Sequence, residues 1–271
     1  MRKLTKSIFL TLALIVFSGT SGNCADFLTG RSAYYRGDYA TALREWRPLA
    51  NQANVHAQYY LGVMHALGQG VSQNYETAVE WFELAAQQEY DFAQYNLGQL
   101  YEEGKGVPRD DGIALKWYTL AARQGNAAAQ NDLGVMYGKG KGVSQNYKTA
   151  VRWYTLAAKQ GNAPAQNNLG VMYEEGKGVS QNYKTAVKWY RLSAEQGYAE
   201  SQHHLALMYG KGTGVTQDLI FAHMWFSIAA SRGYKIVTID QDMVTKNMTP
   251  SQIEIAQDLA LECVRKNYKG C

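Results

Sequence analysis

The chain has 271 residues, with 27 lysines and arginines, 23 aspartates and glutamates, and three cysteines. Residues 1–24 hold three of the basic residues and no acidic one, so the rest of the chain has 24 basic against 23 acidic side chains, a net charge of +1. This balance argues against a nucleic-acid partner, since proteins of that class usually concentrate Lys and Arg on one face.

The first 24 residues have the pattern of a secretory signal peptide. Basic residues precede a run of low polarity from Ile8 to Phe17, and small polar residues follow. The run is too short to span a bilayer, which takes about 20 apolar residues. We expect cleavage between about residues 22 and 25 and export of the remaining protein without membrane insertion. Lipidation of Cys24 is disfavoured, because the residues before it do not fit the bacterial lipoprotein pattern.

Residues 26–54 predict an N-terminal helical cap. They align with the pattern of the later units on a shortened loop, through Asp38, Tyr39, Ala42 and Trp46. Stacked repeat arrays need polar-backed ends of this kind to stay soluble.

Five copies of a 36-residue unit follow, at residues 55–90, 91–126, 127–162, 163–198 and 199–234. A fixed period of this length indicates a stacked repeat array. Each unit is too small to bury its own apolar face, so its neighbours must cover it. The unit is marked by a Leu-Gly pair at Leu61-Gly62, Leu97-Gly98, Leu133-Gly134 and Leu169-Gly170, and by a tryptophan at Trp81, Trp117, Trp153, Trp189 and Trp225.

Each unit predicts two helices joined by a glycine-containing loop. In the third unit, Leu133 lies on the apolar face of the first helix, which ends at Gly140. Asn146 then caps the second helix. The Gly of the Leu-Gly pair lowers helix stability, so we expect it to let a neighbouring helix come close. The predicted buried stripe of the second helix comprises Ala150, Trp153, Tyr154, Ala157 and Ala158, and we interpret the recurring tryptophans as core residues.

Residues 235–271 predict a C-terminal helical cap. Thr249-Pro250-Ser251-Gln252 has the pattern of a capping box, and the helix that it starts should run to about Lys266 and cover the last repeat. Cys263 and Cys271 are the only thiols certain to remain after export, and we expect them to form a disulfide. Two free thiols are the alternative, and two ligands alone make a metal site improbable.

The repeated pattern resembles the Sel1-like repeat family, a relative of the tetratricopeptide repeats. The resemblance rests on A-x-x-x-L-G-x-x-Y, then G-x-G-V-x-x-[ND], then A-x-x-W-[YF]-x-x-A-A-x-x-G, over residues 55–234. It implies an all-α, right-handed α/α superhelical solenoid that acts as a scaffold or adaptor, in bacteria often after export. Some cysteine-rich members are linked to β-lactam or cell-wall compounds, but they carry a cysteine pair in each repeat, which this chain lacks.

A search for reactive groups gives weak candidates. The Gly138–Gly142 loop lacks the spacing of a phosphate-binding loop. His203 and His204 point about 100° apart on a helix and cannot easily share one metal, so we expect one surface and one partly buried histidine. Glu102 and Glu174 stand before loops, where carboxylates more often border solvent. We therefore expect no catalytic site, no metal and no cofactor.

The two residues before the Leu-Gly pair, or before Leu205-Ala206 in the fifth unit, vary between repeats, whereas the structural positions barely vary. By analogy with tetratricopeptide arrays they face the inner groove, where Asn can hydrogen-bond a peptide backbone and Tyr offers rigid contact area. Variation without consequence on a solvated face is an equally good interpretation. The ten candidate residues are Tyr59, Tyr60, Tyr95, Asn96, Asn131, Asp132, Asn167, Asn168, His203 and His204.

The leading hypothesis is a non-enzymatic scaffold that binds a peptide or protein segment in the concave groove. One alternative is a protein that binds or hydrolyses a cell-wall ligand, with Glu102 or Glu174 as the carboxylate, and another is a purely structural spacer. The sequence names neither the partner nor the oligomeric state.

Overall fold

The computed structural model describes residues 25–234 and 237–271, so the predicted signal peptide lies outside the described residues. The described residues form fourteen helices and no strand. The helices are α1 (Phe27–Tyr35), α2 (Tyr39–Asn51), α3 (Val55–Leu67), α4 (Tyr75–Gln87), α5 (Asp91–Glu103), α6 (Asp111–Arg123), α7 (Ala127–Lys139), α8 (Tyr147–Lys159), α9 (Ala163–Glu175), α10 (Tyr183–Ala194), α11 (Ala199–Lys211), α12 (Leu219–Ser231), α13 (Val237–Thr245) and α14 (Pro250–Arg265).

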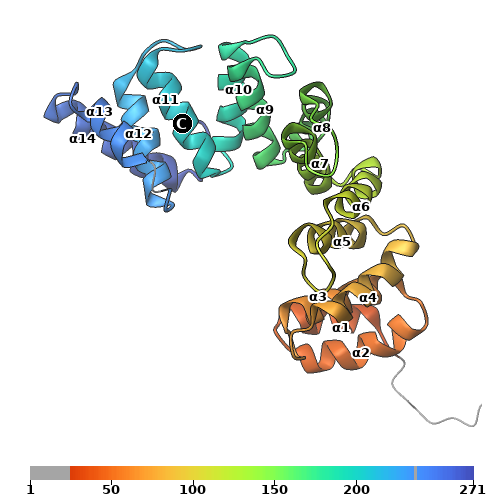
Figure 1. Cartoon of the computed structure of the whole chain (residues 1–271). Helices are drawn as coiled ribbons and strands as arrows, with labels where there is room; N and C mark the ends of the chain where they lie inside the picture. The colour runs from red at the N-terminus through yellow and green to blue at the C-terminus, as the bar shows by residue number, and fades with distance from the viewer. Residues whose placement is uncertain (1–24, 235–236) are drawn as a thin grey trace, which may run out of the picture.

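The helices stack in chain order into an open arch (Figure 1). Helices α3 to α12 are the five predicted pairs, one pair for each 36-residue unit. The first helix of a pair lies toward the hollow of the arch and the second lies outside, as α5 to α8 show most clearly (Figure 1). The predicted α/α solenoid is therefore confirmed.

The ends of the repeated helices are fixed by local capping. Asn146 begins α8, and its side chain accepts a hydrogen bond from the backbone N–H of Thr149. Gly140 ends α7 with a φ of 71°, in the left-handed region that favours glycine. Asn74, Asp110, Asn182 and Asp218 play the same part as Asn146 in the other units.

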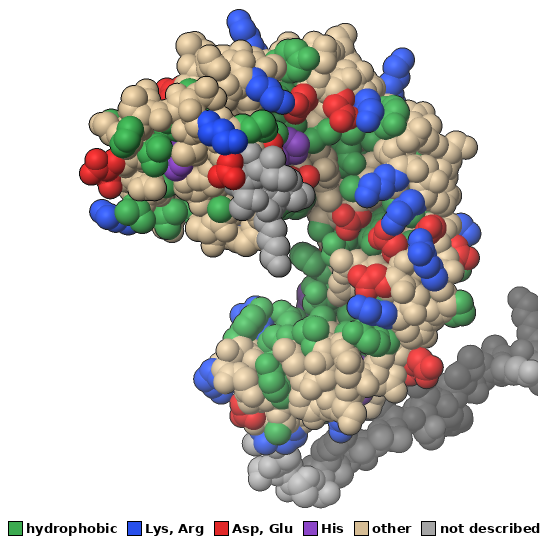
Figure 2. Space-filling model, turned by 60° about the vertical axis from the view of Figure 1, so that its left-hand side comes forward, with side chains coloured by type: hydrophobic (Ala, Val, Ile, Leu, Met, Phe, Trp, Pro, Cys, Tyr) green, Lys and Arg blue, Asp and Glu red, His purple; other side chains and the backbone are tan. Residues whose placement is uncertain are grey.

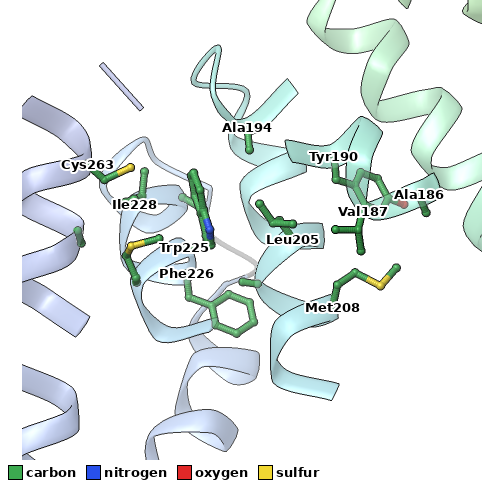
Figure 3. Packing of buried hydrophobic residues seen from close by; sticks show 14 residues of the cluster. Ala186, Val187, Tyr190, Ala194, Leu205, Met208, Trp225, Phe226, Ile228 and Cys263 are labelled. Atoms are coloured by element: carbon green, nitrogen blue, oxygen red, sulfur yellow. The ribbon is translucent and has the colours of Figure 1, made fainter. Parts of the chain in front are cut away.

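The predicted buried stripe needs a correction at the tryptophans. Trp153 is only half-buried, whereas the next residue, Tyr154, is buried. The same holds for Trp81, Trp117 and Trp189, each of which packs at the edge of a core cluster beside a buried Phe or Tyr. Of the five repeat tryptophans, only Trp225 is buried, together with Phe226 (Figure 3). Adjacent residues on a helix point about 100° apart, so only one of the pair can face the core directly.

In the first four units, the core aromatic ring lies against the glycine of the Leu-Gly pair. A Cβ added to Gly134 would stand 2.6 Å from the ring of Tyr154. No side chain fits at that distance, so the glycine permits the close approach that the sequence predicted.

Two helices close each end of the array. At the N-terminus α1 and α2 pack together around Trp46, which is fully buried. At the C-terminus α13 and α14 pack against α12. The capping box of Thr249 and Gln252 is present, and Cys263 and Cys271 form a disulfide. Among the described helices, none is long and apolar enough to cross a membrane.

Candidate interaction surface on the concave face

The structure places the ten predicted groove residues on the first helices of the five units, but none of them is fully exposed. Asn131, Asn167 and His203 are buried, and the other seven are half-buried. The prediction of one surface histidine is therefore wrong, since His203 is covered and His204 stacks on the ring of Tyr190 at 4.7 Å. In the last three units the first member of the pair is buried and the second is half-buried, whereas in the first two units both members are half-buried.

Aromatic side chains dominate the N-terminal part of this face. The ring of Tyr59 lies 5.4 Å from that of Tyr60 and 5.1 Å from that of Tyr90. The hydroxyl of Tyr60 lies 3.3 Å from that of Tyr35, which is 71% exposed. Phe92, half exposed, extends the group toward the rim. Burial raises the pKa values of Tyr59 and Tyr90, so both are uncharged at neutral pH.

A cavity of about 350 Å³ opens beside this aromatic group. Tyr59, Val63 and Leu67 of α3 form an apolar part of its lining, and Asn96 and Gln99 of α5 add two amide groups. Figure 2 shows hydrophobic side chains gathered on the N-terminal arm at the margin of the hollow. The cavity therefore offers an apolar recess with amide groups beside it, which suits one side chain of an extended peptide and its backbone.

A hydrogen-bonded network occupies the middle of the concave face. Asp132 accepts hydrogen bonds from the Tyr95 hydroxyl at 3.1 Å and from the Asn131 amide at 2.9 Å. Asn168 donates to Asn131 at 3.0 Å, so the network joins three consecutive units. Burial raises the pKa of Asp132, because its carboxylate has lost much of its hydration.

The C-terminal part of the face is closed by side-chain contacts. Ser201 donates to the buried Asn167 at 2.8 Å. His203 lies 2.8 Å from Asp240 of α13, which brings that helix against the inner surface of the last repeat. Burial lowers the pKa of His204. Asn167 and His203 therefore lie beneath the surface and hold it in place through these contacts, whereas Asn168 and His204 lie nearer to solvent.

A glutamine that recurs every 36 residues joins neighbouring units and was missed in the sequence, although its fixed spacing was visible. Gln130 is buried, donates to the backbone carbonyl of Ala122 at 3.0 Å, and accepts from Gln160 at 2.8 Å. In the fifth unit Arg232 replaces the outer glutamine, and the side-chain oxygen of Gln202 has no partner among the described residues. The equivalent buried glutamines are Gln58, Gln94, Gln166 and Gln202.

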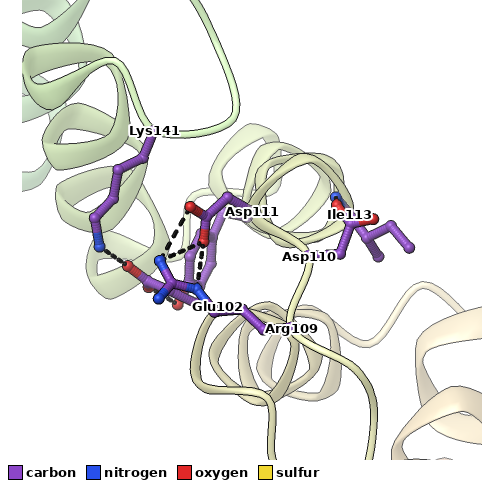
Figure 4. Close-up of polar contacts among 7 residues, drawn as sticks. Glu102, Arg109, Asp110, Asp111, Ile113 and Lys141 are labelled. Atoms are coloured by element: carbon purple, nitrogen blue, oxygen red, sulfur yellow. Dashed lines mark hydrogen bonds and ion pairs between the residues drawn. The ribbon is translucent and has the colours of Figure 1, made fainter.

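The candidate carboxylates have structural partners. Glu102 accepts a hydrogen bond from Tyr118 at 2.9 Å and forms an ion pair with Lys141 at 2.9 Å (Figure 4). Glu174 accepts from Tyr190 at 2.6 Å. Nothing in these contacts supports the cell-wall hydrolase alternative. Within the described residues, no group of three or more His, Cys, Asp or Glu side chains could hold a metal ion.

The comparisons with known proteins agree with this architecture. The family model of the Sel1 repeat matches residues 55–90, 91–126, 127–162, 163–198 and 199–234. The chain belongs to the Sel1 repeat family. Sel1 repeat proteins are generally scaffolds for protein–protein interaction, and the fold is typically non-enzymatic.

Two solved structures are similar over most of this chain. A Sel1 repeat protein from Oxalobacter formigenes has 32% identity and a TM-score of 0.78, covering 87% of this chain and 98% of its own. The protective antigen c5321 of uropathogenic Escherichia coli has 35% identity and a TM-score of 0.77, covering 89% of this chain. This chain spans about half of c5321, 53% of its length. The comparison with curated proteins finds no match.

Proposed function

We propose that this Sel1 repeat protein is a non-enzymatic adaptor that holds a peptide or protein segment along its concave face. The observation that carries the proposal is the cavity beside Tyr59 and Asn96, at the end of the aromatic group. Stacked repeats present such surfaces because their inner helices are held at fixed spacing.

The proposed contact residues follow from their burial. Tyr59, Tyr60 and Asn96 contribute the N-terminal part of the surface, and Asp132, Asn168 and His204 continue it toward the C-terminus. Asn131, Asn167 and His203 hold these side chains from behind through the hydrogen bonds described above. Tyr95 belongs to both groups, since its half-buried hydroxyl donates to Asp132.

The proposed compartment is an exported space of a bacterium, periplasmic or extracellular. The Cys263–Cys271 disulfide supports this, because disulfides persist mainly in oxidising compartments. The related structures from Oxalobacter formigenes and Escherichia coli support a bacterial origin.

Affinity capture from an extract of the source cells tests the proposal. The immobilised protein should retain a partner protein that the double variant Asn96→Ala, Asn168→Ala loses. A matched control, Gln87→Ala, removes an exposed amide at the end of α4, outside the cavity lining, and should retain the partner. If the double variant retains the partner as well as the wild type does, or if no protein is retained, the concave face is excluded as the binding surface.

A further inference from the structure

The outward faces of α6, α8 and α10 carry a concentrated positive charge. Positions spaced by four, seven, eight and eleven residues lie on one side of a helix. In these three helices that side carries eight exposed cations. Glu195 is the acidic residue at an equivalent position. The cations are Lys116 and Arg123 on α6, Lys148, Arg152 and Lys159 on α8, and Lys184, Lys188 and Arg191 on α10.

These charges are not neutralised locally. Among the described residues, none of the eight takes part in an ion pair. The chain after residue 24 has a net charge of only +1, so the acidic residues that balance this face lie elsewhere on the molecule. On α4 the equivalent positions hold Glu76, Glu80 and Glu83. The basic face is therefore a property of these three units and not of the repeat in general.

Exposed leucines project from the same face. Leu120, Leu156 and Leu192 are 43%, 47% and 46% exposed, and each lies four residues after one of the cations. In the fifth unit the equivalent residue, Ile228, is 1% exposed because it lies in the core beside α14. Cations with apolar side chains between them are the pattern of a surface that adsorbs to anionic lipid.

We propose that the outward face of α6, α8 and α10 binds peripherally to the surface of an anionic phospholipid bilayer. Each Lys or Arg near such a surface strengthens adsorption by about fivefold. Exposed ion pairs with the three glutamates on α4 of a second copy would be weaker, because each is worth little in water. Nucleic acid fits less well, since single strands are bound by stacking on aromatic rings, and leucines stand at these positions. Bound in this way, the concave face would point away from the membrane and stay open to a partner.

Vesicle co-sedimentation tests this surface. The protein should bind vesicles containing roughly one-third phosphatidylglycerol at low salt, should not bind phosphatidylcholine vesicles, and should dissociate at about 0.5 M NaCl, where screening is strong. The variant Lys148→Gln, Arg152→Gln, Lys184→Gln, Lys188→Gln should bind at least ~100-fold more weakly. All four side chains are exposed, so circular dichroism should show an unchanged fold.

A matched control removes four exposed cations from other parts of the chain: Arg31→Gln, Lys139→Gln, Lys246→Gln and Lys269→Gln. It should bind the anionic vesicles nearly as well as the wild type. Equal weakening by both variants, or no binding to phosphatidylglycerol, would overturn the proposal. So would tighter binding to polyglutamate or to a DNA oligonucleotide than to the vesicles, which would assign the face to an acidic protein or to nucleic acid.

Discussion

The ring of Tyr154 and the backbone of Gly134 show how one pair of residues joins the two helices of a repeat. Tyr154 is 4% exposed, and a Cβ on Gly134 would meet its ring at 2.6 Å. Trp153, the larger side chain, lies at the edge of the core cluster between α6 and α7. We therefore expect the residue after the tryptophan to contribute more to folding stability than the tryptophan itself.

Truncating these two aromatic residues should separate their contributions. We expect Tyr154→Ala to lower the free energy of unfolding by about 3–5 kcal/mol, as large core deletions do, and Trp153→Ala to lower it by less because part of its ring stays in water. Urea unfolding followed by circular dichroism measures both. A larger loss for Trp153→Ala would reverse this assignment of the core.

Two glycines of α7 should respond in opposite directions to alanine. Gly134→Ala should destabilise by about 1–3 kcal/mol, because the new methyl overlaps the ring of Tyr154. Gly138→Ala should stabilise by up to about 1 kcal/mol, because alanine favours the helix and the new methyl would stand an ordinary 3.6 Å from the Tyr154 hydroxyl oxygen. The thermal midpoints of the two variants provide the comparison, and a shift of the same sign in both would contradict it.

Asp132 should lower the stability of the folded protein at neutral pH, because its carboxylate is partly buried. Its pKa is raised by burial, so the folded protein binds the proton more tightly than the unfolded chain does. Stability from this group is therefore lost as pH rises through the interval between the two pKa values. Asp132→Asn should unfold at higher urea concentration than the wild type at pH 7, and the difference should vanish below about pH 3, where both states are protonated. A variant that is less stable at pH 7 would contradict this.

The helices were predictable because their ends are set locally. Asn146 and Gly140 act within their own turns, so residue type and spacing were enough to place them. The depth of burial was not predictable in the same way. Whether Trp153 or Tyr154 enters the core depends on where the next helix lies, and that is a tertiary property. The buried glutamines escaped notice for the same reason, since their partners lie on other helices.

The disulfide should hold the tail that follows α14. It joins Cys263, buried in that helix, to Cys271 at the end of the chain. Reduction should lower the free energy of unfolding of this segment by about 2–3 kcal/mol, the usual effect of closing a short loop. Hydrogen exchange of residues 260–271 with and without reductant measures it. Intact mass after alkylation without reductant is the check, and two alkyl adducts would show that the bridge is absent.

The arch as a molecule separates two surfaces, an inner one of aromatic and amide side chains and an outer one of cations. Sequence spacing placed Tyr59 and Asn96 correctly on the first helices, but it could not show that Asn131 and Asn167 would be buried by neighbouring units. The net charge of +1 likewise suggested no charged face, because a sum over the chain hides how α6, α8 and α10 collect their cations on one side. The first difference arises from contacts between units, which the sequence of one unit does not contain, and the second from the placement of the cations on their helices.

Site-specific photocrosslinking in living cells tests most directly whether the concave face binds a protein. A photoreactive amino acid is placed at Asn96 or Asn168 on the inner surface, and at Leu84, which is 43% exposed on the outer side of α4, as the control. We predict a discrete protein adduct from both inner positions and none from Leu84. An adduct from Leu84 alone, or no protein adduct from either inner position, would contradict the adaptor function.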